Sequence, residues 1–301
     1  MRTLVMALAV SLPSAVLAQS VPAPPDASPV IAAERAFAAD YPGMGMGGSF
    51  RLWAEPGAIM IVGGRARPVE EVFPVGAPRD PQEPSLEWWP NFAGISRSGD
   101  LGFTTGGVAV NGNRAGHYFT VWRRQPDGSW RWVYDGGPTA SAADVPGPNS
   151  EPVVLTPGPE LLLVANADGS IPNVPADWAF ARVKRLEAEL AREAAVAQKA
   201  AHLAVLADEA RLYVGQRPPA IGNAAHVEAL DDWPETFRFG ATEGGGQSKY
   251  GDLVWTYGPA SWTEDGRDGS GMYVRLWQRQ EGGFRIVVAY LISDPPPPGA
   301  Q

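Results

Sequence analysis

The chain carries one order of residues twice, about 150 positions apart. The pattern Gly-Asp-Leu-x-x-Thr-x-Gly occupies residues 99–106 and again residues 251–258. Each copy is followed by Gly-x-Tyr-x-x-x-Trp-x-Arg-Gln, at 116–125 and at 271–280. A shared order of glycine, acidic and aromatic positions over such a length is typical of a duplicated domain. We therefore expect two copies of one fold.

Segments of distinct composition divide the chain around these copies. Arg2 precedes an apolar run that ends in Val-Leu-Ala before Gln19, which is the pattern of a secretory signal peptide. A membrane anchor is the alternative, but Pro13 and Ser14 interrupt the run, which is short for a bilayer. Stretches rich in Pro and Gly mark linkers. The expected division is a signal peptide at 1–18, a Pro-rich leader at 19–27, a first domain at 28–137, a Pro/Gly-rich linker at 138–175, a second domain at 176–293 and a Pro-rich tail at 294–301.

Composition excludes several classes of function. The net charge of -9 argues against nucleic acid and against an anionic membrane surface, because both require a basic surface. The chain has no cysteine, so no disulfide forms and the fold is held by its core alone. No zinc motif, dinucleotide fingerprint or hydrolase elbow is present. We expect no metal, no cofactor and a periplasmic or secreted location.

Each copy is expected to begin with a helix and to continue as antiparallel strands. Ser28-Pro29 is a helix start, and Val30, Ala33, Phe37 and Tyr41 then fall on one helical face. The second copy has a long Ala/Glu/Arg-rich helix over about 177–207, which is long enough that we expect either a break in it or an extension along the linker. Helices on one face of an antiparallel sheet define the α+β class.

This order of elements and motifs resembles the nuclear transport factor 2-like superfamily, and in particular its exported bacterial branch of unknown function. The resemblance covers 28–137 well and 177–292 more loosely, with Ala289 in place of Asp135. It implies two tandem cone-shaped domains, each a curved antiparallel sheet wrapped around its N-terminal helix. It also implies a conical apolar pocket and a relation to ketosteroid isomerases and polyketide cyclases. Function must still be argued from the site.

Strand alternation suggests which residues line that pocket. Met272, Val274 and Leu276 are uniformly apolar, and we expect them to face the helix of the second copy. The same alternation places His117, Phe119 and Val121 on the inner face of the first copy and leaves Trp122 on the outer face. We expect the aromatic outer faces of the two copies to pack together as an intrachain pseudo-dimer.

Two side chains are candidates for proton transfer. His117 has no counterpart in the second copy, where Met272 stands, and Asp135 ends the last strand of the first copy. Either can act as a general acid or base, and either can be a satisfied core residue. Phe37, Phe119 and Val121 complete the expected ligand pocket. Asp100 and Asp252 recur in both copies, which favours a turn aspartate over a pocket base.

Three functions remain open. The first is binding of a small apolar molecule in the pocket of copy one, with copy two as its structural partner. The second is a cofactor-free isomerase or cyclase in which His117 and Asp135 move a proton. The third is a non-catalytic interaction protein of the envelope, which predicts pockets filled by side chains and an exposed apolar patch.

Overall fold

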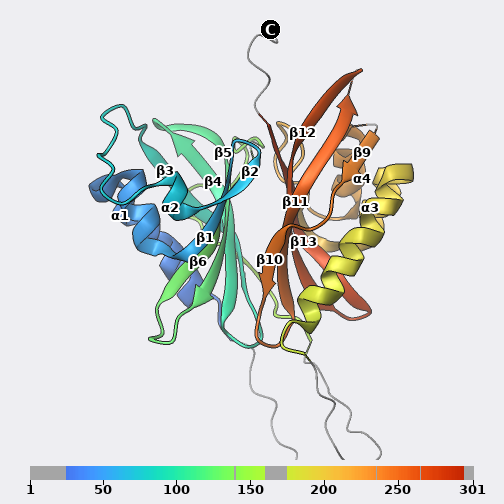
Figure 1. The fold of residues 1–301 in the computed structure, drawn as a ribbon, viewed down its shortest axis with the longest axis horizontal. Coiled ribbons are helices and arrows are strands. Elements are labelled where there is room, and N and C mark those ends of the chain that lie inside the picture. Colours follow the sequence, from blue (N-terminus) through green and yellow to red (C-terminus); the bar gives the residue numbers. More distant parts are fainter. Residues whose placement is uncertain (1–24, 139, 160–174, 235, 265, 295–301) are drawn as a thin grey trace, which may run out of the picture.

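The computed structural model describes residues 25–138, 140–159, 175–234, 236–264 and 266–294. The expected signal peptide, most of the leader and all but the first residue of the tail lie outside these residues. Within them the chain forms two α+β domains, as the repeat predicts. Figure 1 shows two sheets facing each other at the centre, with α1 outside one sheet and α3 outside the other.

Domain 1 consists of a long helix and a seven-stranded sheet in the order β2-β1-β6-β5-β4-β3-β7. The sheet is mixed, because β1 pairs parallel with β6 and β7 pairs parallel with β3. The other strand pairs are antiparallel. The elements are α1 (Ser28–Trp53), β1 (Ala54–Val62), β2 (Arg65–Pro68), α2 (Val69–Val72), β3 (Leu86–Ile95), β4 (Leu101–Val110), β5 (Asn113–Arg124), β6 (Trp130–Gly136) and β7 (Val153–Leu155).

Domain 2 repeats this plan with a six-stranded sheet in the order β10-β11-β12-β13-β8, to which β9 adds beside β11. Its helix α3 bends at Ala197, where φ and ψ leave the helical region, so the expected break is present. The elements are α3 (Trp178–Val205), β8 (Leu206–Leu212), α4 (Asn223–Ala229), the short 3₁₀ turn η1 (Leu230–Asp232), β9 (Thr236–Phe239), β10 (Gly244–Gln247), β11 (Leu253–Glu264), β12 (Arg267–Gln280) and β13 (Gly283–Ser293).

The helix α1 packs through the face that its apolar spacing predicts. Val30, Ala33, Phe37 and Tyr41 are all buried, and Phe37 contacts Trp122 of β5 with ring centroids 6.2 Å apart. Burying apolar side chains of this size stabilises the fold by about 1.5–3 kcal/mol for each large one. The helix is therefore held to the sheet by an aromatic core on its inner face.

The described part of the expected linker belongs to the fold. Residues 153–155 form β7, whose register pairs Val154 with Ala93 of β3. The chain then reaches domain 2, where the side-chain amide of Gln278 donates to the carbonyl of Thr156 at 2.8 Å. This segment therefore extends the first sheet before it contacts the second domain.

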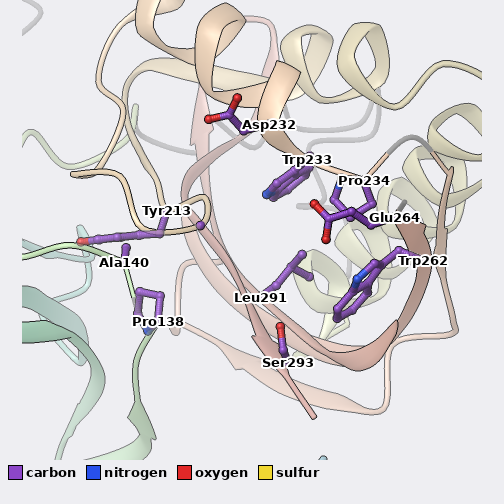
Figure 2. A pocket seen from close by; sticks show the side chains of 11 residues that line it. Pro138, Ala140, Tyr213, Asp232, Trp233, Pro234, Trp262, Glu264, Leu291 and Ser293 are labelled. Carbon is purple, nitrogen blue, oxygen red and sulfur yellow. The ribbon is translucent and has the colours of Figure 1, made fainter. Parts of the chain in front are cut away.

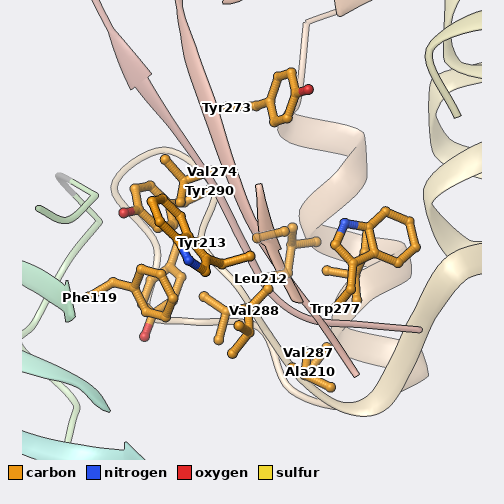
Figure 3. Packing of buried hydrophobic residues seen from close by; sticks show 14 of the residues in the cluster. Phe119, Ala210, Leu212, Tyr213, Tyr273, Val274, Trp277, Val287, Val288 and Tyr290 are labelled. Carbon is orange, nitrogen blue, oxygen red and sulfur yellow. The ribbon is translucent and has the colours of Figure 1, made fainter. Parts of the chain in front are cut away.

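The two sheets pack against each other through a buried set of aromatic side chains. The hydroxyl groups of Tyr134 and Tyr290 lie 2.8 Å apart, and those of Thr105 and Tyr213 lie 2.7 Å apart. The rings of Phe119 and Tyr290 are in contact, with centroids 5.8 Å apart. Figure 3 shows Phe119 beside Tyr213 and Tyr290 at this contact. The sheet faces that meet are therefore apolar, with hydroxyl pairs that satisfy one another.

The sequence prediction of the sheet faces is wrong. Trp122 and Trp277 point towards the helices of their own domains, where their indole N–H groups donate to Glu34 and Glu187. Phe119 points instead towards the other domain, and Figure 3 shows Val274 near Tyr290, on the opposite side from Trp277. The prediction assigned the more apolar face to the helix. That face is in fact buried against the other sheet, whereas the alternation along β5 is unbroken, because the extra residue of the bulge at this point lies on β6.

The repeated aspartates form a reciprocal contact between the domains. The backbone N–H of Arg97 donates to Asp252 Oδ2 at 2.7 Å, and the N–H of Lys249 donates to Asp100 Oδ2 at 3.0 Å. Each carboxylate also accepts a serine hydroxyl from its own turn; Ser248 donates to Asp252 Oδ1 at 2.7 Å. The turn interpretation of these aspartates is confirmed, and each of them also accepts a hydrogen bond from the other domain.

Replacing Asp252 with Ala should destabilise the protein by about 2–3 kcal/mol, because the carboxylate is buried and its loss leaves buried donors without an acceptor. Asp100→Ala should cost less, since Asp100 is half-buried and water can replace it. Urea unfolding of both variants measures the difference. Equal losses of unfolding free energy would contradict the assigned role of the buried carboxylate.

Candidate functional site

The centre of domain 1 contains a buried glutamate that the sequence prediction missed. Glu34 lies on the apolar stripe of α1, between Val30 and Phe37, and is 0% exposed. Its Oε1 accepts the indole N–H of Trp88 at 2.6 Å, and its Oε2 accepts the N–H of Trp122 at 3.0 Å and the hydroxyl of Thr104. Three donors from the sheet therefore converge on one carboxylate of the helix.

A second carboxyl lies in the same interior. Asp135 of β6 is 7% exposed, and its Oδ2 accepts the hydroxyl of Thr120 at 2.7 Å. Burial raises the pKa of Asp135 well above its ordinary value, and the charge of Glu34 raises it further. Burial also raises the pKa of Glu34, but the hydrogen bonds from Thr104, Trp88 and Trp122 oppose that shift. Burial and the neighbouring charge therefore favour the protonated form of Asp135 more strongly than that of Glu34.

Among the described residues, the carboxyl pair of domain 1 has no ion-pair partner. Within the described ranges, neither Glu34 nor Asp135 forms an ion pair with a Lys or Arg side chain. The hydroxyl of Tyr118 faces the same interior; it is buried, it makes no hydrogen bond of good geometry among the described residues, and Thr104 is the polar side chain beside it. Burial raises the pKa of Tyr118 well above its ordinary value, so this hydroxyl stays protonated. Among the described residues, domain 1 thus contains a carboxyl pair without a cation next to a buried tyrosine hydroxyl.

In domain 2 an arginine neutralises the equivalent buried glutamate. Glu187 occupies the same place on α3, between Val183 and Leu190, and its Oε1 accepts Thr256 Oγ1 and Trp277 Nε1 at 2.7 Å each. Its Oε2 lies 2.5 Å from Arg275 Nη1 in a fully buried ion pair. The buried glutamate is thus common to both domains, and the arginine is not.

The arginine occupies the position of Thr120 in the repeated strand motif. Asp135 is the cross-strand partner of Thr120, and Ala289 is the cross-strand partner of Arg275, so Ala289 stands where domain 1 has Asp135. The guanidinium also lies over the ring of Tyr273, 4.3 Å from its centroid. Domain 1 therefore has an acidic pair and domain 2 an ion pair because the domains differ at these two positions.

His117 does not share the site with Asp135. Its side chain points to the opposite face of the sheet, where its ring contacts Tyr213 of domain 2, with centroids 4.9 Å apart. Its Nε2 lies 2.7 Å from the carbonyl of Ser141, and burial lowers the pKa of His117. The structure does not bring the two proposed proton-transfer residues together, because the face assignment that joined them was wrong.

The expected pocket residues divide between the two faces in the same way. Phe37 lies in the interior with Glu34, whereas Phe119 and Val121 lie at the contact between the sheets. Aromatic side chains fill much of the space between α1 and the sheet. Trp53 and Trp88 are only half-buried, so the mouth of this interior is formed by the rings of two tryptophans.

The sequence contained a signal for the glutamates. Each long helix carries one glutamate in its apolar stripe, four residues after a valine and three before another large apolar residue. An acidic residue on a buried face is rare unless it is paired. Because it recurs at the same place in both copies, Glu34 and Glu187 could have been named from the sequence.

Cavities occur away from this carboxyl pair. One of 140 Å³ lies at the mouth of domain 2, against the first domain, and Figure 2 shows Trp233, Trp262 and Leu291 around it. Another of 260 Å³ lies between β1 and β10. Across the described residues there is no group of three acidic or histidine side chains that could hold a metal ion, and no helix long and apolar enough to span a membrane.

No family model matches the chain, and no curated protein matches it. Solved structures similar to it include a putative aromatic ring hydroxylase from Novosphingobium aromaticivorans, with 19% identity over 41% of this chain and 94% of that one and a TM-score of 0.34. A nuclear transport factor 2-like protein of unknown function from Pseudomonas putida has 12% identity over 39% and 95%, with a TM-score of 0.31. The Delta 5-3-ketosteroid isomerase of a Mycobacterium species has 16% identity over 36% and 89%, with a TM-score of 0.30. Each of these structures is thus similar to about two fifths of this chain, and one of them is named as nuclear transport factor 2-like.

Proposed function

We propose that domain 1 binds a small, largely apolar molecule that carries one hydrogen-bond acceptor, such as a ketone oxygen. The observation that carries this proposal is the pair Glu34–Asp135, which has no ion-pair partner among the described residues, beside the buried hydroxyl of Tyr118. A carboxyl kept protonated by an apolar site can donate a hydrogen bond. The proton of Asp135 and the hydroxyl of Tyr118 would then serve as two donors for one oxygen atom.

Domain 2 is the structural partner in this proposal. Its glutamate is neutralised by Arg275, and its sheet covers the outer face of the first sheet as in a pseudo-dimer. The aromatic rings that close the mouth of domain 1 must move to admit a ligand, and Trp53 and Trp88 are the half-buried ones. Opening of this kind on binding is common in regulatory proteins.

Proton transfer of the isomerase or cyclase type is the second candidate. Two carboxyls in different environments are the usual arrangement for an acid and a base, and burial raises the pKa of Asp135 strongly while three hydrogen bonds oppose the rise for Glu34. Against it, both oxygens of Glu34 already accept hydrogen bonds, which leaves the charged carboxylate poorly placed to take a proton from a substrate. The geometry therefore favours binding over catalysis.

The test is a thermal-shift titration of the full chain with a 3-keto steroid and an aromatic ketone, each beside its hydrocarbon analogue. A ligand at 100 times its Kd should add about 2.7 kcal/mol to the unfolding free energy. We expect the shift for the ketone, and we expect Tyr118→Phe and Asp135→Ala to abolish it. Tyr273→Phe is the matched control, because Tyr273 occupies the same motif position in domain 2.

Two results would contradict the proposal. A ketone shift that is unchanged in both domain 1 variants would place the binding site elsewhere. Equal shifts for ketone and hydrocarbon would show that the acceptor atom is not recognised. If neither ketone gives a shift, the third function, a structural or interaction role, gains support and the binding proposal falls.

A further inference from the structure

A separate cavity lies between the two domains, where β1 of domain 1 faces β10 and β11 of domain 2. Its volume is 260 Å³, and residues of both domains line it, including Ile59 and Val133 on one side and Trp255 and Tyr257 on the other. The cavity exists because β10 reads Gly244-Gly-Gly-Gln. Gly246 pairs with Trp255 and Gly244 with Tyr257, so no side chain from β10 covers these two rings.

Two N–H donors meet beside this cavity. The indole N–H of Trp255 is buried and has no acceptor among the described residues, and the side chain is 4% exposed. A buried donor without an acceptor is unfavourable, so it indicates a site for an acceptor. Arg123 uses Nη1 to pair with Glu55 Oε1 at 2.8 Å. The Arg123 side chain lines the cavity and is 38% exposed, so its other terminal nitrogen, Nη2, is available to donate to a ligand.

The two donors lie close enough for one acceptor group to reach both. A Cβ atom on Gly246 would lie 3.0 Å from Trp255 Nε1 and 3.5 Å from Arg123 Nη2. Both nitrogens therefore surround the same small volume, which stays free because residue 246 is a glycine. Gly246 has no left-handed backbone angle, so its conformation does not require glycine. Glycine at position 246 therefore keeps the volume between the two nitrogens open, and the backbone conformation is not the reason for it.

The rest of the cavity limits the chemistry of a ligand. The rings of Trp255 and Tyr257 are stacked at 5.7 Å with an interplanar angle of 27°, which offers a flat aromatic wall. Glu55 neutralises Arg123 and also accepts the side-chain amide of Gln125 at 3.1 Å, so the polar end carries no net charge. A neutral acceptor suits such an end better than an anion does, since Glu55 would repel a negative charge.

We propose that this cavity binds a small, flat aromatic molecule whose neutral carbonyl oxygen accepts hydrogen bonds from Trp255 Nε1 and Arg123 Nη2. The site needs both domains, because Arg123 and Glu55 belong to the first and Trp255 and Gly246 to the second. It is distinct from the carboxyl pair inside domain 1, which lies on the other face of that sheet. Binding here would also hold the two domains together.

Benzamide is the probe for this site, with benzoate as its charged analogue. The ¹⁵N-labelled full chain is titrated while the indole N–H resonances are followed, and Trp255→Phe identifies the resonance of Trp255. We expect benzamide to move that resonance and benzoate to move it less. Gly246→Ala should weaken the affinity at least about tenfold, because its methyl group lies between the donors. Gly43→Ala is the control, since a Cβ there meets nothing within 4 Å.

Different results would overturn the site itself or only the neutral class of ligand. A Trp255 resonance that stays fixed with both probes at tens of millimolar, or equal affinities for Gly246→Ala and wild type, overturns the site. Binding of benzoate without benzamide overturns the neutral class of ligand. Should Gly246→Ala fail to fold, Trp255→Phe replaces it, with the backbone N–H of Gly246 as the reporter. Loss of benzamide binding in that variant then supports the site, and unchanged binding overturns it.

Discussion

Asp135→Asn is expected to stabilise the protein at pH 7 and to leave its stability nearly unchanged near pH 4. Burial and the charge of Glu34 raise the pKa of Asp135 in the folded state above the ordinary value of 3.8. The folded protein therefore retains a proton that the unfolded chain loses as pH rises. The stability from this group is complete below the unfolded pKa and is lost as pH rises to the folded pKa, by about 1.4 kcal/mol per pH unit. Asparagine still accepts the hydroxyl of Thr120 but does not titrate.

Urea unfolding of wild type and Asp135→Asn between pH 4 and pH 8 measures this difference. The gap in unfolding free energy should open with increasing pH and then level off above the folded pKa. Asp208→Asn on β8 is the control, because Asp208 is exposed. A constant gap across the range would show that Asp135 titrates alike in both states and would contradict its assignment as the protonated carboxyl.

Arg275→Met is expected to cost about 3–5 kcal/mol, which is the usual effect of leaving one partner of a buried ion pair behind. Glu187 is 3% exposed and would remain as a charge without a cation. The double variant Arg275→Met with Glu187→Gln should recover much of that loss. Both Thr256 and Trp277 donate to Oε1 of Glu187, so the amide oxygen of glutamine can accept them while its NH₂ group faces the new methionine.

The same unfolding experiment on the two single variants and the double variant gives the coupling energy. A double variant no more stable than Arg275→Met alone would contradict the assignment, because it would show that the charge of Glu187 is not the source of the loss. A loss below about 1 kcal/mol for Arg275→Met, as is typical of exposed pairs, would contradict the buried pair itself.

The architecture followed from the sequence because the repeat and the helical spacing are local patterns. The stripe of Val30, Phe37 and Tyr41 is buried as predicted, and the long helix of the second copy breaks as expected. The parallel pairing of β1 with β6 did not follow, since the sequence marks both only as short strands. Such pairing depends on where the chain returns to the sheet after α1.

The site was predicted only in part because alternation does not say which face meets which neighbour. Asp135 lies in the helix-facing interior as proposed, but His117 lies at the contact between the sheets. Each face of β5 is buried, one against α1 and one against domain 2, so hydrophobicity could not tell them apart. Comparison of the two helices would have found Glu34, since a buried acidic residue recurs in both.

In domain 1 burial favours the protonated form of Asp135, where domain 2 holds an ion pair. The most direct measurement is the carboxyl ¹³C resonance of Asp135 in protein labelled at aspartate, assigned by its absence in Asp135→Asn and followed from pH 3 to pH 8. We predict a signal that stays in its protonated position well above the ordinary pKa of 3.8. A signal that titrates at or below that value would show that both carboxyls of domain 1 ionise, and would contradict the account.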